Sequence, residues 1–290
     1  MGKFLINING ELFDETTGKI SVFDRGFLYG DSVYEATRTF NRIPFRIHQH
    51  LERLFDSAEK IALSPTLSRA EILTSITQTI AASLHENISL RIILTRGTNS
   101  DIGLDPELSS ANNLIIITKA ILPNPAWWLT TGLSMVFYKK KSSQKGSLPK
   151  SGNYQENILA NKEALARGAY DAIMVNADGH VTESSTSNIW MVKDGVIYTP
   201  ALKDGVLEGL TRKTIFEMAS HKNLNIKEAT LTPQDFLTAD ECFITSTTRN
   251  IVPVTKIEGH PIGGAMPGKL TMELLSTYLE YVSVGHPKEI

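Results

Sequence analysis

The stretch Ser32-Val-Tyr-Glu-Ala-Thr-Arg-Thr-Phe40 decides the fold class, because its side chains alternate between two faces. In an extended chain one face receives Val33, Glu35, Thr37 and Thr39, and the other receives Tyr34, Ala36, Arg38 and Phe40. Just beyond it, Ile47 to Leu63 changes to helical spacing, with apolar residues on one stripe. A strand followed by an amphipathic helix favours an α+β fold.

The rest of the first half repeats this pattern. Phe4 to Asn9 alternates as a strand does and ends in the hairpin signal Asn9-Gly10. Ser68 to Leu84 is predicted to be a second helix, opened by a capping box of Ser68 and Glu71. Further strands are predicted at Ser89–Thr95 and Asn113–Thr118. Pro123 and Pro125 then interrupt the periodicity, so we predict a small domain at 1–121 and a linker at 122–132.

The second half alternates short strands with three helices and is predicted to be a larger domain at 133–290. The predicted helices are Tyr154–Arg167, Thr211–His221 and Leu270–Tyr281. The predicted strands are Leu133–Tyr138, Ala172–Val175, His180–Thr182, Asn188–Val192, Val196–Tyr198, Phe243–Thr245 and Val252–Ile257. Ala177-Asp178-Gly179 and Lys193-Asp194-Gly195 are turn sequences between strands.

The composition is that of an ordinary soluble globular protein. The 290 residues, 41% apolar and 21% charged, suit two domains. A net charge of −2 argues against nucleic acid as a partner. No apolar run approaches the roughly 20 residues that span a bilayer, and the first ten residues do not resemble a signal peptide. We expect a cytoplasmic protein without a membrane partner. The seven histidines show no metal-site spacing, and the single Cys242 is expected to be buried.

Two segments carry groups that suit one cofactor. Lys150-Ser-Gly-Asn-Tyr154 places a lysine and a phenol near the start of a predicted helix, and Glu183 follows one hairpin later. A lysine amine can form an imine with the aldehyde of pyridoxal phosphate, while a carboxylate keeps the pyridine nitrogen protonated. Most lysines are surface charges, but Lys150 follows Leu148-Pro149 and precedes a glycine, so it is not on a charged helical face.

Two further segments could bind a phosphate group. Gly209-Leu210-Thr211-Arg212 opens a predicted helix and offers backbone N–H groups and a hydroxyl. Thr245-Ser246-Thr247-Thr248 supplies four hydroxyls directly after a predicted strand. Each could instead be an ordinary helix cap or a polar strand end. Their occurrence together with Lys150 and Glu183 favours a phosphate site.

With these motifs in place, the chain resembles the fold-type IV pyridoxal-phosphate enzymes over about residues 21–261. This group contains branched-chain and D-amino acid aminotransferases and aminodeoxychorismate lyases. The segments that carry the resemblance are Phe23–Glu35, His50–Ala58, Lys150–Tyr154, Glu183–Asn188, Leu207–Thr211 and Ile244–Thr248. The resemblance implies a small α/β N-terminal domain, a larger C-terminal pseudo-barrel domain with helices, and a homodimer whose active site is shared between subunits.

The resemblance also implies residue roles. Lys150 matches the catalytic lysine, and Glu183 matches the partner of the pyridine nitrogen. The remaining cofactor residues that it implies are Arg53, Tyr154, Asn188, Leu207, Leu210, Thr211, Ser246 and Thr247. Substrate contacts are expected at Tyr29, Tyr34, Arg38, Arg91, Thr248 and Arg249. For Arg38 a core ion pair with a nearby acid is the alternative.

The implied reaction moves an amino group between an amino acid and a 2-oxo acid, for which 2-oxoglutarate is the expected compound. D-amino acid aminotransferases that resemble this chain carry an Arg-x-His pair after a Thr-Arg-Gly turn, and none follows Thr95-Arg96-Gly97. The segment 91–106 instead resembles branched-chain enzymes, although Ala36-Thr37 departs from their Phe-Glu-Gly-x-Arg pattern. Branched-chain L-amino acids are therefore the expected substrates. A D-amino acid aminotransferase of non-standard type and an aminodeoxychorismate lyase are the alternatives.

Overall fold

The protein was analysed as a computed structural model that describes residues 4–109, 111–141, 146, 148–222 and 224–283. The chain forms two compact units. The first contains Met1–Leu122 and Pro149–Asn153, and the second contains Pro123–Leu148 and Tyr154–Val284. The segment around Lys150 thus groups with the first unit, although it is distant from it in sequence. The domain limits of 1–121, 122–132 and 133–290 stay a prediction.

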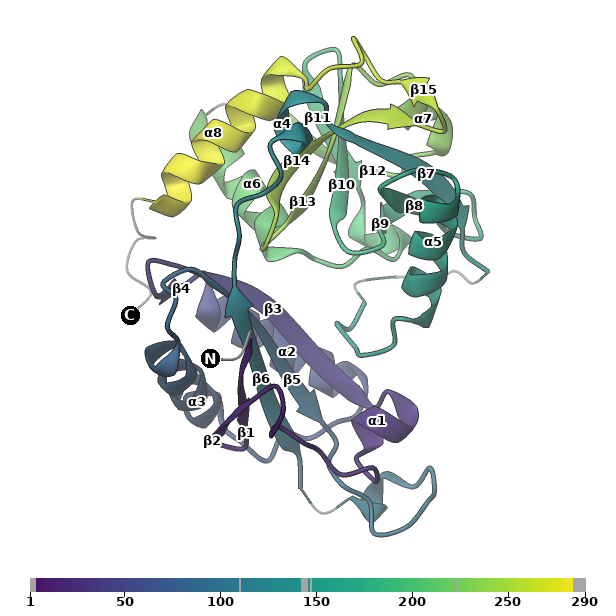
Figure 1. Ribbon diagram of the computed structural model, residues 1–290. Helices are drawn as coiled ribbons and strands as arrows, with labels where there is room; N and C mark the ends of the chain where they lie inside the picture. The colour runs from purple at the N-terminus through teal and green to yellow at the C-terminus, as the bar shows by residue number, and fades with distance from the viewer. Residues whose placement is uncertain (1–3, 110, 142–145, 147, 223, 284–290) are drawn as a thin grey trace. The chain divides into compact units, whose positions relative to one another are not determined.

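The first unit is built on an antiparallel sheet in the order β2-β1-β6-β5-β3-β4 (Figure 1). Its strands are β1 (Phe4–Ile8), β2 (Glu11–Asp14), β3 (Ser32–Phe40), β4 (Ile43–Pro44), β5 (Ile88–Thr95) and β6 (Asn113–Ala120). The predicted strand at 32–40 is confirmed to the residue. The predicted hairpin is also confirmed, because Asn9 and Gly10 connect β1 to β2 with positive φ angles of 52° and 95°.

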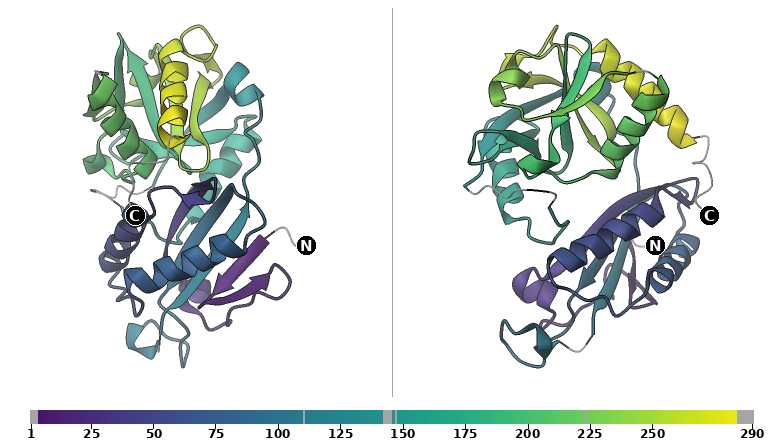
Figure 2. Two further views of the ribbon diagram at one scale, coloured as in Figure 1. Left: turned by 90° about the vertical axis from the view of Figure 1, so that its left-hand side faces the viewer. Right: turned by 180° about the vertical axis from the view of Figure 1, so that it is seen from behind.

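Two helices, α2 (Ile47–Lys60) and α3 (Arg69–Ala82), cover one face of this sheet (Figure 2). Leu51 and Leu54 of α2 pack with Val33 of β3 and with alternate residues of β5. The capping box is confirmed, since Ser68 Oγ accepts from Glu71 N and the Glu71 carboxylate accepts from Ser68 N. Two short elements, the helix α1 (Arg25–Tyr29) and the 3₁₀ turn η1 (Pro106–Leu108), lie in the connections. The covered face takes the Val33 side of β3, which leaves the Tyr34 side for other contacts.

The second unit contains a mixed sheet in the order β12-β11-β10-β13-β14-β7-β8-β9, with β15 beside β14. Its strands are β7 (Leu133–Lys139), β8 (Asp171–Val175), β9 (Val181–Ser184), β10 (Asn188–Lys193), β11 (Val196–Pro200), β12 (Ile226–Ala229), β13 (Glu241–Ser246), β14 (Asn250–Ile257) and β15 (His260–Pro261). A tight turn joins β9 to β10, where Ser184 N donates to Ser187 O at 2.7 Å. β9 is at one end of the sheet order and β10 is near the other end, so this contact shows that the sheet curls toward a barrel.

Helices flank this sheet at several places. They are α4 (Trp127–Thr130), α5 (Gln155–Ala166), α6 (Leu210–Lys222), α7 (Pro233–Leu237) and α8 (Lys269–Ser283), with the 3₁₀ turn η2 (Leu202–Asp204). Cys242 lies in the core of the sheet, and its expected burial is confirmed. Desolvation by that burial, together with the nearby charge of Glu241, raises the pKa of the Cys242 thiol well above its ordinary value. None of the helices in the described part of the chain combines the length and the apolar character that a membrane span requires.

Candidate active site

Lys150 lies on a short segment that pairs with β3. Tyr34 N donates to Lys150 O at 2.9 Å, and Gly152 N donates to Ser32 O at 2.9 Å. Between them Val33 and Ser151 form an antiparallel bridge. The backbone of Lys150 is therefore held to β3, on the side away from β5.

The side chain of Lys150 lies over the ring of Tyr34. Its Nζ lies 4.5 Å from the centroid of the Tyr34 ring, and the Arg91 guanidinium lies 4.0 Å from the same centroid. An aromatic face attracts cations at such distances. Lys150, Tyr34 and Arg91, three residues predicted to be functional, thus lie together.

Two other residues predicted to contact substrate also come from the first unit. Arg38 follows Tyr34 on the same face of β3 and places its guanidinium 4.2 Å from the Phe40 ring centroid, a cation–π contact. Tyr29 ends α1, is 38% exposed, and packs its ring against Arg25 at 5.1 Å. The substrate role of Arg38 and its alternative, a core ion pair, both stay predictions.

Arg53, expected to bind the cofactor phosphate, forms a buried ion pair. Its Nε and Nη2 donate to Oε1 and Oε2 of Glu35, both at 2.7 Å, and His50 Nδ1 lies 2.6 Å from Glu35 Oε2. Burial raises the pKa of Glu35, but the charge of Arg53 and the hydrogen bonds outweigh it and hold that pKa far below its ordinary value. Burial lowers the pKa of His50, so His50 is neutral at pH 7 and supports Glu35 as a hydrogen-bond donor.

In the second unit, Glu183 of β9 and Asn188 of β10 both engage the segment before α6. Leu207 N donates to Glu183 Oε2 at 3.3 Å, and Asn188 Nδ2 donates to Leu207 O at 2.9 Å. Both side chains bond to the backbone of Leu207, so the predicted cofactor residues Glu183, Asn188 and Leu207 lie together. The acid of this group, Glu183, is partly buried.

The start of α6 has the features of a phosphate site. Leu210 begins the 13-residue helix, whose first N–H groups have no partner within the helix. Gly209 approaches Asn188 so closely that a Cβ at position 209 would lie 2.0 Å from Asn188 Oδ1. Thr211 Oγ1 and Ser246 Oγ are buried and have no hydrogen-bond partner among the described residues. Buried hydroxyls are rarely left unbonded, so these two fit a group that donates no proton and accepts several hydrogen bonds.

The turn between β13 and β14 contains Thr247, Thr248 and Arg249. Arg249 Nη1 donates to Thr186 Oγ1 at 2.9 Å and to Ser187 Oγ at 3.3 Å. The guanidinium therefore links this turn to the turn that separates Glu183 from Asn188. Tyr154 is the N-cap residue of α5.

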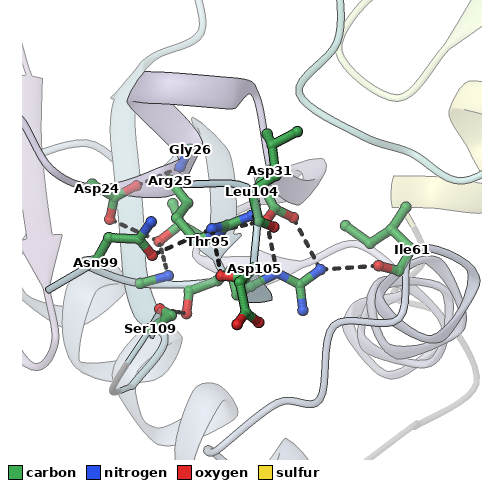
Figure 3. A network of polar contacts seen from close by, with 12 residues as sticks. Asp24, Arg25, Gly26, Asp31, Ile61, Thr95, Asn99, Leu104, Asp105 and Ser109 are labelled. Atoms are coloured by element: carbon green, nitrogen blue, oxygen red, sulfur yellow. Dashed lines mark hydrogen bonds and ion pairs between the residues drawn. The ribbon is translucent and has the colours of Figure 1, made fainter. Parts of the chain in front are cut away.

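Sequence reasoning did not identify the polar network that shapes the segment after β5 (Figure 3). Arg25 donates to the backbone oxygens of Gly103, Leu104 and Asp105, each at 3.1 Å, and to Asp31 at 2.8 Å. Arg96 donates to the same Asp31 at 2.7 Å. This irregular segment is fixed by charge-assisted hydrogen bonds.

Glu35 and His50 were also missed as supporting residues, and so was Ser57 of α2, whose Oγ accepts from Lys150 N at 3.1 Å. The alternation of β3 gave one signal, because it placed an acid, Glu35, on the face covered by the helix. An acid on a buried face requires a cation, and Arg53 and His50 lie on that helix. Among the described residues no group of three or more His, Cys, Asp or Glu side chains is arranged to hold a metal ion.

Comparison with known proteins gives consistent results. The family model for amino-transferase class IV matches residues 32–257. A protein of Methanocaldococcus jannaschii named "Putative branched-chain-amino-acid aminotransferase" is 33% identical, over 93% of each chain. The D-alanine aminotransferase of Bacillus licheniformis is 31% identical, over 91% of this chain and 92% of that relative.

Among solved structures, the T.th. branched-chain amino acid aminotransferase complexed with N-(5′-phosphopyridoxyl)-L-glutamate superposes with a TM-score of 0.88. Its sequence is 26% identical, and the match covers 98% of this chain and 95% of that one. The family match spans most of the residues that form both units, including β3, the Lys150 segment and the start of α6. The chain therefore belongs to the class IV aminotransferase family.

Proposed function

We propose that this aminotransferase binds pyridoxal 5′-phosphate and transfers an amino group from a branched-chain L-amino acid to a 2-oxo acid such as 2-oxoglutarate. The cofactor agrees with the family and with the phosphopyridoxyl compound in the T.th. enzyme. The observation that carries the cofactor part of the proposal is the pair of buried, unpartnered hydroxyls of Thr211 in the first turn of α6 and Ser246 at the end of β13. They suit a dianionic phosphate group. The branched-chain substrate is supported by the similarity to branched-chain aminotransferases.

Each group of residues has a role in this proposal. Thr211, Ser246, Thr247 and the first N–H groups of α6 would donate to the phosphate group, and Arg53 is the guanidinium that the family resemblance implies for it. Leu207 and Leu210 would pack against the cofactor, and Asn188 holds Leu207 in place. Tyr154 would donate to the cofactor's phenolic oxygen. Glu183 would accept a hydrogen bond from the protonated pyridine nitrogen and so keep that nitrogen charged.

When bound, pyridoxal phosphate supplies an aldehyde that captures an amine and a ring that draws electrons from the substrate Cα. Lys150 Nζ would take the proton from the substrate Cα and deliver it to C4′ of the cofactor, acting first as a general base and then as a general acid. The substrate carboxylate is bound by arginine, with Arg38, Arg91 and the turn at Thr248-Arg249 as the candidate groups, and Tyr29 and Tyr34 border the substrate.

The first test is the Lys150→Ala variant. It should lose turnover and the visible absorption of the bound cofactor, while Glu71→Gln, an exposed residue of α3, should keep both. Full turnover in Lys150→Ala would refute the proposal.

A second test addresses the substrate. Stopped-flow half-reactions with L-leucine, D-alanine, D-glutamate and an (R)-amine separate the candidates, and L-leucine should react fastest. The similarity to a D-alanine aminotransferase makes a D-selective enzyme the second candidate, and a faster reaction with D-alanine would establish it. Consumption of 2-oxoglutarate distinguishes both from a lyase, which needs no second substrate.

We also propose a homodimer. Large apolar side chains are exposed on two segments that the Asp24–Thr98 bridge joins, namely Val22, Phe27, Ile102 and Leu104 at 64%, 64%, 70% and 78%. An exposed apolar cluster of this kind suits a protein interface. Light scattering after size exclusion should give twice the chain mass of 32.0 kDa. A mass of one chain would contradict it.

A further inference from the structure

The Lys150 segment is fixed to β3 on one side only. The bonds from Tyr34 N and Gly152 N, with the Val33–Ser151 bridge, set the position of residues 150–152 along the strand. These bonds use the carbonyl group of Lys150 and the N–H group of Gly152. The amide N–H of Lys150 takes part in none of them and requires its own acceptor.

That acceptor is a side chain of α2. Lys150 N donates to Ser57 Oγ at 3.1 Å, across 93 positions of sequence. Ser57 is 2% exposed, and its neighbours on the helix, Leu54 and Ala58, are fully buried in the core. The bond ties the Lys150 segment to the helix as well as to the strand.

Serine at position 57 is less favourable for protein stability than alanine would be, and the hydrogen bond from Lys150 N offsets this loss. Alanine favours a helix interior more than serine does, and a hydroxyl buried in an apolar layer is unfavourable unless it is hydrogen-bonded. A matching case occurs on α3, where Thr79 is fully buried and accepts from Asn7 Nδ2 at 3.0 Å. Both hydroxyls hold a distant segment to a helix, but only that of Ser57 holds the lysine.

We propose that Ser57 is a positioning residue for Lys150, and that it acts by fixing the backbone from which the amine reaches its reacting atoms. This inference rests on the proposed function of Lys150. The lysine side chain leaves a backbone anchored at three points and ends 4.5 Å from the Tyr34 ring centroid. Proton transfer depends steeply on geometry, so a small shift of this backbone slows the step that Lys150 performs.

A double-mutant cycle in the holoenzyme tests this. Ser57→Ala should slow the half-reaction with the best amino acid about ten-fold. The amino acid concentration that gives half of the maximal rate should change little. In the Lys150→Ala background, methylamine in solution replaces the missing amine. There Ser57→Ala should change the methylamine-dependent rate less than about two-fold, because the added amine is not attached to the chain.

Hydrogen exchange of the full-length protein gives a readout independent of activity. Ser57→Ala should accelerate exchange in the peptide that contains Lys150 about ten-fold and leave the peptide of β5 unchanged. Thr79→Ala is the matched control, because it removes a buried helix hydroxyl but should alter neither the Lys150 peptide nor the half-reaction rate.

The outcomes separate two failures. An equal loss of rate in the Lys150 and Lys150→Ala backgrounds, or no loss and no change of exchange, would overturn the role of Ser57. If Ser57→Ala does not fold, Ser57→Thr keeps an acceptor oxygen and must then retain the slow exchange of the Lys150 peptide. Turnover by Lys150→Ala without methylamine would instead overturn the proposed function. In that case the hydrogen exchange of the Lys150 peptide in Ser57→Ala would still decide whether Ser57 holds this segment.

Discussion

The buried carboxylate of Glu35 gives the sharpest prediction about stability. Its side chain is fully buried and receives bonds of 2.7, 2.7 and 2.6 Å from Arg53 and His50. Glu35→Gln keeps the shape but removes the charge, and the amide directs two N–H donors toward groups that are themselves donors. Breaking a buried ion pair by removing one partner costs about 3–5 kcal/mol. Loss of two charge-assisted hydrogen bonds, at about 1.5–3 kcal/mol each, gives a similar total.

The assay is thermal and urea unfolding of the protein without added cofactor, so that ligand binding does not contribute to stability. The thermal midpoint should fall by on the order of 10 °C. The control is Glu273→Gln, because Glu273 is exposed and pairs with Lys269 on the helix surface. A loss below about 1 kcal/mol for Glu35→Gln would show that the bonds to Arg53 and His50 do not act as the geometry requires.

The pH dependence carries a second part of this prediction. The pKa of Glu35 is lower in the folded protein than in the unfolded chain. The contribution of Glu35 to the free energy of unfolding is therefore complete at a pH above its ordinary pKa, and it is lost as the pH falls below that pKa. The pKa of His50 is also lowered by folding, so protonation of the unfolded chain removes stability below its ordinary value of 6.5. Glu35→Gln should flatten the loss of stability below about pH 4.5. An unchanged slope there would contradict the pairing.

The remaining predictions concern the cofactor site and the core. Gly152→Ala should slow the half-reaction, because a Cβ at position 152 would lie 2.4 Å from Ser32 Oγ. Adding Ser32→Ala should restore the rate, since the other contacts of that Cβ are 3.6 Å or longer. A double variant as slow as the single one would rule out this clash. Thr211→Val and Ser246→Ala should each weaken binding of pyridoxal phosphate about ten-fold in a fluorescence titration but leave binding of pyridoxal, which lacks the phosphate, unchanged. Equal losses for both compounds would exclude a phosphate contact. The Cys242 thiol should react with a disulfide reagent only on unfolding, because it is buried in the core and its pKa is raised; rapid reaction in the native protein would contradict this.

The long helices and strands could be predicted because their sequences are long enough to show a regular spacing of apolar and polar residues. The strand β3 alternates over nine residues, and α3 begins at a capping box. The short elements α1, α7 and β12 were not predicted, since four or five residues contain too little periodicity. Their ends depend on local bonds instead: Asp24 accepts from Gly26 N at the start of α1, and Thr232 and Asp235 form a capping box at α7.

The candidate site could be predicted as a set of residues but not as an arrangement. Lys150, Glu183 and Thr211 stood out because their chemical groups suit one cofactor. Their supports come from distant parts of the chain, such as Ser57 for the Lys150 amide, and no local pattern pairs residues 93 positions apart. Contacts of that kind are fixed by tertiary packing, which follows from the whole sheet rather than from a motif.

The motif Phe23–Glu35, which carried much of the family resemblance, acts mainly by positioning other residues. Asp24 accepts from Thr95 Oγ1 and Asn113 Nδ2, and Arg25 and Asp31 fix the segment after β5. Glu35 holds Arg53 in place. The charges of this motif are thus engaged in fixing the geometry of the first unit. Arg38 and Arg91 are the candidate substrate residues of this unit, so substrate assays of their variants can decide between branched-chain and D-amino acids where the motif cannot.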